Sequence, residues 1–238
     1  MARLPRLSAA GQMHLMIQRV HPGLSLFVDP AGRQAYLLCL AEAAAKHGVA
    51  IHGYGLTPAE VRILATPPDA QALGHLVQFI GRRFVAGFNR QHGRRGALWE
   101  GRFRTTIVEP IEYFLPCLRY VEGAVEGMAE IKPRDPVADD VPWSSAEHHA
   151  GHRTDPFITE HAQFWSLGNT PFEREAAYRS SMHQARAPAE AEGIAIASLH
   201  GWVLGSEEFV RTLGAQLDRR LRPLRPGRPA LRKTSAPL

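Results

Sequence analysis

The order of predicted strands and helices is the feature that most constrains the fold. Apolar spacing and Pro or Gly breaks predict strand, helix, strand, strand, helix, strand and helix within the first 130 residues. The strands are 12–19, 49–56, 60–66 and 102–109; the helices are 30–47, one with an apolar stripe from Leu73 to Phe88, and one from Pro110. The simplest fold for that order is α+β: a ferredoxin-like antiparallel sheet with helices on one face.

The rest of the chain has a different character. Residues 131–143 are rich in Pro and Asp, and Thr170 to Glu173 form a capping box that opens a helix to about Arg186. Two more helices are expected near 189–199 and 206–217. We therefore predict a sheet domain of residues 1–130, a linker and connecting segment of 131–169, a small all-helical module of 170–218, and a disordered basic tail of 219–238.

Composition excludes several classes of protein. With 238 residues, 45% of them hydrophobic, the chain is not disordered as a whole. No apolar run approaches the roughly 20 residues that span a bilayer, and the first residues lack a secretory signal. Cys39 and Cys117 lie in apolar helical patterns and are expected to be reduced core residues. We therefore expect a cytoplasmic protein with no membrane partner.

Positive charge is concentrated in two segments. Residues 82–104 contain seven arginines and one acid, a net charge of +6, and residues 219–238 carry seven cations and no acid, +7, which leaves −8 for the rest of a chain of net charge +5. Arginine suits bidentate contacts with phosphate. The segregation favours surfaces that bind a polyanion, and solvated helix faces with a disordered tail are the alternative.

The helix from Pro110 holds a candidate nucleophile. Its buried stripe is expected at Phe114, Cys117, Leu118, Val121 and Val125, and Tyr113 and Tyr120 flank it. A tyrosine beside Arg119 could attack a phosphodiester, although half-buried packing is the commoner role. Pro116 should destabilise this helix by about 3 kcal/mol unless the helix kinks or begins there.

Several strings resemble the REP-associated tyrosine transposases, a group of single-tyrosine HUH transposases. The resemblance spans nearly the whole chain and is strongest at residues 98–104 (Leu-Trp-Glu-Gly-Arg-Phe-Arg). Further similar strings are residues 2–6, the pair Arg119-Tyr120, Asp135-Pro136, residues 142–145 (Pro-Trp-Ser-Ser), residues 205–209 and residues 227–229.

This resemblance implies a mechanism and a partner. In that family a tyrosine attacks single-stranded DNA to form a 5′-phosphotyrosine, so the nucleophile would be Tyr120 and the substrate single-stranded or hairpin repeat DNA. Aromatic residues in the basic stretch, Trp99, Phe103 and Phe88, could stack on unpaired bases. From the charge pattern and the resemblance, the expected DNA-binding residues are Arg82, Arg83, Arg90, Arg94, Arg95, Trp99, Arg102, Arg104, Arg119, Arg225 and Arg228.

The family's metal site does not carry over. The two histidines expected on one strand are replaced by Glu60 and Arg62, which share a face at period two. A guanidinium has no lone pair for a metal, so we expect no metal or cofactor. Two substitutes remain open: Arg62 replacing the metal's charge, or Mg²⁺ or Mn²⁺ bound by Glu60 with His14 or His52. The family's Asn-Pro after the tyrosine is also missing.

Other motifs leave alternatives open. His148, His149 and His152 are expected in an exposed loop, with a zinc site as the alternative. Residues 225–229 (Arg-Pro-Gly-Arg-Pro) could enter a minor groove or contact phosphates non-specifically, and the C-terminal helices could be a helix-turn-helix or a packing module.

Three candidate functions follow. The first is a transposase-like protein that cleaves and rejoins DNA through Tyr120, with activity impaired or lost at residues 60 and 62. The alternative is a non-catalytic repeat-DNA binder or regulator, and an unrelated enzyme on the same scaffold is a third. A homodimer is left open.

Overall fold

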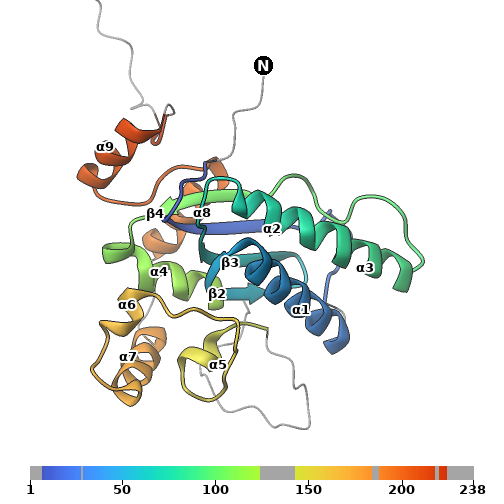
Figure 1. Ribbon diagram of the computed structural model, residues 1–238, viewed down its shortest axis with the longest axis horizontal. Helices are drawn as coiled ribbons and strands as arrows, with labels where there is room; N and C mark the ends of the chain where they lie inside the picture. Colours follow the sequence, from blue (N-terminus) through green and yellow to red (C-terminus); the bar gives the residue numbers. More distant parts are fainter. Residues whose placement is uncertain (1–6, 28, 124–142, 184–187, 218–219, 224–238) are drawn as a thin grey trace, which may run out of the picture.

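The computed structural model describes residues 7–27, 29–123, 143–183, 188–217 and 220–223. It contains a four-stranded sheet of β1 (Met13–Arg19), β2 (Ala50–Leu56), β3 (Glu60–Thr66) and β4 (Arg104–Val108), in the order β2-β3-β1-β4 with every neighbouring pair antiparallel (Figure 1). With its intervening helices this is the ferredoxin-like topology. The predicted α+β class and antiparallel sheet are confirmed.

The first two helices lie on one face of this sheet. α1 (Pro30–His47) begins with Asp29, whose Oδ1 accepts a 2.7 Å hydrogen bond from the Gly32 amide, and it ends at Gly48 with a positive φ of 63°. α2 (Ala72–Ile80), a π-helical segment η1 (Gly81–Val85) and α3 (Ala86–Gln91) follow one another where a single helix was expected.

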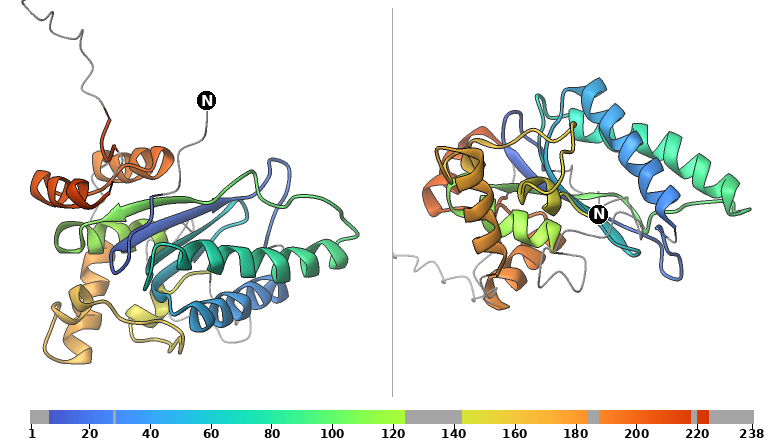
Figure 2. Two further views of the ribbon diagram at one scale, coloured as in Figure 1. Left: turned by 45° about the horizontal axis from the view of Figure 1, so that its top comes forward. Right: turned by 90° about the horizontal axis from the view of Figure 1, so that it is seen from below.

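α4 (Pro110–Glu122) covers the opposite face, so the prediction of helices on one face is wrong (Figure 2). The reason lies in the strands, which are apolar on both sides. Leu15 and Ile17 of β1 join the core under α4, whereas Met16 joins the core under α1. Because successive side chains point to opposite faces, both faces have to be buried. Pro110 begins α4 as predicted, and Pro116 lies within it.

Four of the C-terminal helices lie on the same side as α4: α5 (Ala146–His149), α6 (Ala162–Trp165), α7 (Pro171–His183) and α8 (Pro188–His200). α9 (Glu207–Gln216) instead packs against Ile107 of β4, which points to the same sheet face as Met16. The predicted capping box opens α7: the Glu173 amide donates to Thr170 Oγ1 at 3.2 Å, and the Thr170 amide donates to Glu173 Oε2 at 3.1 Å.

The C-terminal helices also share apolar cores with the sheet. Tyr178 and Ile194 join the core under α4, and a third core combines Ile107 of β4 with Val203 and Leu213. The predicted division into domains stays a prediction, and most of the predicted tail lies outside the described residues. Within the described ranges, no helix has the length and apolarity required to cross a membrane.

Candidate nucleic-acid interface

Strand register brings four charged residues to one end of the sheet face that α4 covers. Arg62 of β3 pairs with Ile17 of β1, which pairs with Arg104 of β4, and Arg19 pairs with Glu60 two residues along. Directly paired residues in an antiparallel sheet point to the same face. The resulting face carries three arginines and one carboxylate, which gives it a local excess of positive charge.

Arg62 joins this face to α4. Its Nε donates to Glu60 Oε1 at 2.6 Å and its Nη1 donates to the Tyr120 carbonyl oxygen at 2.8 Å. Its guanidinium carbon also lies 4.1 Å from the centroid of the Tyr120 ring, a cation–π contact. Arg19 Nε binds Glu60 Oε2 at 3.2 Å. We call Arg19, Glu60, Arg62, Arg104 and Tyr120 the Tyr120 cluster.

Tyr120 is half-buried at the edge of the apolar stripe of α4, as its spacing predicted. Burial raises the pKa of its hydroxyl, and the nearby Arg62 guanidinium opposes that rise. Within the described residues, no group hydrogen-bonds to Tyr120 Oη. The phenol is therefore protonated at neutral pH and lies beside a cation.

The donor set does not fit a divalent metal. The Glu60 carboxylate is bound by Arg62 and Arg19, and a guanidinium offers no lone pair. The alternative of Glu60 with His14 or His52 is wrong, because the sheet register places both histidines at the other end of the strands. His14 pairs with Ala65, five residues along β3 from Glu60, or about 16 Å at strand rise.

Both histidines also have their ring nitrogens engaged elsewhere. His14 contacts the Gln12 carbonyl at 2.7 Å and accepts from the Ala9 amide at 3.2 Å. His52 contacts the Thr159 carbonyl at 2.7 Å and Thr66 Oγ1 at 2.8 Å. Among the described residues, no three His, Cys, Asp or Glu side chains are grouped as a metal site would require.

The segment that precedes β4 lies alongside this cluster. Trp99 forms an isolated antiparallel β-bridge with Val20, and the Glu100 amide donates to the Arg19 carbonyl at 3.0 Å. The segment therefore pairs with the end of β1, beyond the part of β1 that pairs with β4. Arg102 follows, exposed, and Arg104 begins β4. The Arg104 Nη1 atom is buried without a hydrogen-bond partner in the described residues, an unusual state for a cation.

The remaining predicted residues divide into several groups. Arg82, Arg83, Arg90 and Arg95 are exposed along η1, α3 and the loop that follows, and Arg94 donates to Asn89 Oδ1 at 3.4 Å in the same region.

Arg119 points elsewhere: it donates to the Ser181 carbonyl at 3.2 Å and to Glu190 Oε2 at 3.1 Å, which ties α4 to α7 and α8. Arg225 and Arg228 lie outside the described residues. Of the predicted stacking residues, Trp99 is half-buried, but Phe88 and Phe103 are core residues and cannot stack on bases.

A buried polar cluster around Glu122 was missed from the sequence. The Glu122 carboxylate, 0% exposed, accepts from Ser145 Oγ at 2.5 Å, from Tyr178 Oη, and contacts His149 Nδ1 at 2.7 Å. Burial and the Glu122 carboxylate raise the pKa of Tyr178, which keeps its phenol protonated and donating. We call Glu122, Ser145, His149 and Tyr178 the Glu122 cluster.

A signal for this cluster did exist: Glu122 follows Leu118 by four residues, so it belongs to the buried stripe of α4. α4 also packs closely on β2 at Gly53. A side chain at this position would clash with α4, since a Cβ added to Gly53 would lie 2.6 Å from Leu118 Cδ1. The expectation of an exposed loop for the three histidines is wrong for His149, which is 1% exposed, whereas His152 is exposed.

Comparison with known proteins yields fold-level similarities only. No family model and no curated protein matches the chain. One similar solved structure is a REP-associated tyrosine transposase bound to a REP hairpin, with 13% identity over 68% of this chain and 92% of that chain and a TM-score of 0.49. Another is a candidate transposase from Deinococcus radiodurans R1, with 18% identity over 48% and 92% and a TM-score of 0.36.

Proposed function

We propose that this chain binds single-stranded or hairpin DNA at the Tyr120 cluster and along the adjacent arginines, without metal-dependent cleavage. The observation that carries the proposal is that Arg19, Arg62 and Arg104 share one sheet face, where Arg62 contacts the half-buried Tyr120 and Glu60 is the counter-charge. Arg104 is partly exposed, and its guanidinium suits contact with a phosphodiester. The resemblance in the sequence leads to the same class of ligand.

Binding is tested with fluorescently labelled single-stranded and hairpin oligonucleotides at about 50 and 200 mM salt. Each lost phosphate contact should lower the slope of log affinity against log salt by about 1. We expect Arg104→Ala to weaken binding about tenfold, and Arg211→Ala, which removes an exposed arginine on α9, to change it less than about twofold. No binding by the wild-type chain, or equal effects of the two variants, would refute the proposal.

A second candidate, strand cleavage by Tyr120, is favoured by the contact of Arg62 with the tyrosine ring and by the absence of a described partner on Tyr120 Oη. The phenol oxygen would attack phosphorus, the bond to the 3′ oxygen would break, and that oxygen would leave with a proton. Arg62 would face the charge that develops on phosphate. The raised pKa of Tyr120 opposes this step, so the binding function is the better supported.

The two candidates differ in one product. A detergent-resistant protein–DNA adduct that Tyr120→Phe abolishes would establish cleavage, and its absence with and without Mg²⁺ or Mn²⁺ leaves binding alone. The double variant Glu60→His with Arg62→His locates the defect. Adduct formation by that variant would show that residues 60 and 62 alone block a metal-dependent reaction.

A further inference from the structure

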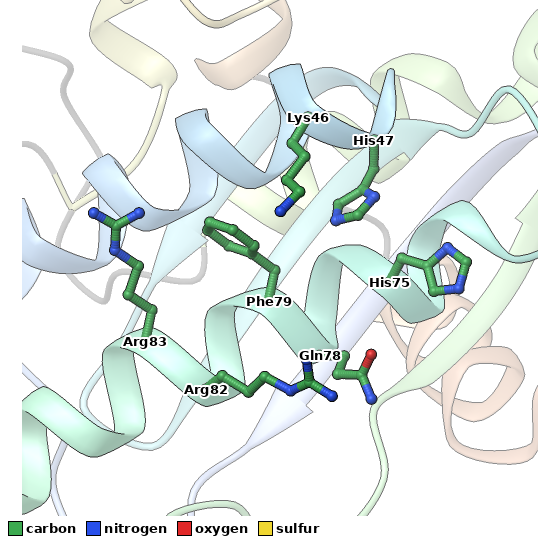
Figure 3. Close-up of a pocket in the computed structure, with 7 residues that line it drawn as sticks. All are labelled: Lys46, His47, His75, Gln78, Phe79, Arg82 and Arg83. Carbon is green, nitrogen blue, oxygen red and sulfur yellow. The ribbon is translucent and has the colours of Figure 1, made fainter.

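A second cationic surface lies on the other side of the sheet, between α1 and the helix that follows β3. It is a pocket of about 400 Å³ formed where the last turn of α1 meets α2 and η1 (Figure 3). The lining side chains are Lys46, His47, His75, Gln78, Phe79, Arg82 and Arg83. Since α1 and α2 cover the face opposite α4, this pocket is separate from the Tyr120 cluster.

Two of the pocket's three permanent cations lie close to one aromatic ring. Lys46 Nζ lies 5.0 Å and the Arg83 guanidinium carbon 5.8 Å from the centroid of the Phe79 ring. The His47 and His75 rings are 5.6 Å apart. Three permanent cations and two imidazoles therefore line the pocket, and none of its seven lining residues is a carboxylate.

Counter-charges within the described residues are few. Glu42 pairs with Arg83 from the rim, and Asp69 acts on His47. Within the same residues, neither Lys46 nor Arg82 has an ion-pair partner. Burial, followed by His75 and Lys46, lowers the pKa of His47. Two imidazoles among permanent cations are a poor cation site, so the chemistry of this pocket selects an anion.

We propose that this pocket binds a phosphate group of DNA, as a second contact on the side of the sheet opposite Tyr120. The inference rests on the proposed DNA-binding function and assigns it another site. DNA is favoured over free phosphate because the exposed arginines continue along the helix. Arg82 and Arg90 are eight residues apart, about 12 Å at helical rise, which corresponds to three or four nucleotides of one strand.

Placing a carboxylate in the pocket tests the inference. Gln78 is exposed on α2, so Gln78→Glu should leave the fold intact, which thermal unfolding checks. The matched control is Gln216→Glu, the same change at an exposed position of α9. We expect Gln78→Glu to weaken hairpin DNA binding about tenfold and to reduce the salt dependence by about one phosphate contact, whereas Gln216→Glu should weaken it less than about twofold.

Inorganic phosphate separates the two sources of the anion. It is titrated into the wild-type chain and Gln78→Glu at matched ionic strength and followed by calorimetry. If DNA binds the wild-type chain and both glutamate variants equally, the pocket proposal is wrong although the proposed function stands. If phosphate binding alone depends on Gln78, the pocket is a free-anion site and its assignment to DNA is wrong. If the wild-type chain binds no DNA, the proposed function fails first.

Discussion

α4 carries two polar clusters with opposite properties. Tyr120 and Glu122 are two residues apart, about 200° around the helix, so they face different surroundings. In the Glu122 cluster a fully buried carboxylate is bound by three side chains from α5, α7 and the residue before α5. In the Tyr120 cluster the side chains of Arg62 and Arg19 are 17% and 51% exposed, and cations outnumber the single carboxylate.

The difference separates a structural role from a binding role. A buried charge is tolerated when its hydrogen bonds are satisfied, and removing it leaves the partners unpaired. An excess of cations at the surface contributes little to folding, but it attracts and binds anions from solution. The Glu122 cluster should therefore govern stability, and the Tyr120 cluster should govern ligand binding.

The largest expected effect is the loss of Glu122. Glu122→Ala leaves Ser145, His149 and Tyr178 without their shared acceptor, and we expect the free energy of unfolding to fall by about 4 kcal/mol. Urea unfolding followed by circular dichroism measures it. The matched control is Glu112→Ala, an exposed glutamate of the same helix, which should cost less than about 0.5 kcal/mol. Similar losses in both variants would remove the contrast.

The second largest effect is expected from acid, which should lower the free energy of unfolding through His52, a buried residue near the Glu122 cluster. Burial lowers the pKa of His52 to about 4, while its hydrogen bond to Thr159 and the nearby His161 and His149 act more weakly. The unfolded chain binds the proton below about pH 6.5 and the folded chain only near pH 4, so stability is complete above pH 6.5 and is lost as pH falls.

Between pH 7 and pH 5 His52 should account for a loss of about 2 kcal/mol. Urea unfolding at the two pH values measures this loss in the wild-type chain and in His52→Gln. The variant should lose about 2 kcal/mol less on acidification. The same change at the exposed His152 should leave the acid loss unaltered, and an equal loss in all three proteins would contradict the assignment.

The two clusters also show which parts of the site could be predicted from the sequence. Period two placed Glu60 and Arg62 on one face, and helical spacing placed Tyr120 at the edge of a buried stripe; the structure joins them through Arg62. Local spacing could not provide the partners of Glu122, because Ser145 and Tyr178 lie 23 and 56 residues away in the chain. The covering of the second sheet face is different, because the strands are apolar on both sides and α4 follows β4 directly in the chain.

A smaller effect on stability is expected at Arg62. Arg62→Ala removes one of the two arginines on Glu60 and the contact with Tyr120, while Arg19 still pairs with the carboxylate. We expect the free energy of unfolding to fall by about 1 kcal/mol and DNA binding to weaken about tenfold. Urea unfolding and oligonucleotide titration of one preparation give both values. A large loss of stability with unchanged DNA binding would reverse the roles assigned to the two clusters.

The smallest effect on stability comes from removing one hydroxyl at each cluster. Tyr120→Phe removes an oxygen with no hydrogen-bond partner among the described residues, so stability should change by less than about 0.5 kcal/mol. The same substitution at Tyr178 removes a buried hydrogen bond to Glu122 and should cost about 2 kcal/mol. Thermal and urea unfolding of the two variants compare identical chemistry in the two environments. Equal losses would mean that Tyr120 Oη is as firmly bound within the fold as Tyr178 Oη, and a phenol held in that way would not be available to a phosphodiester.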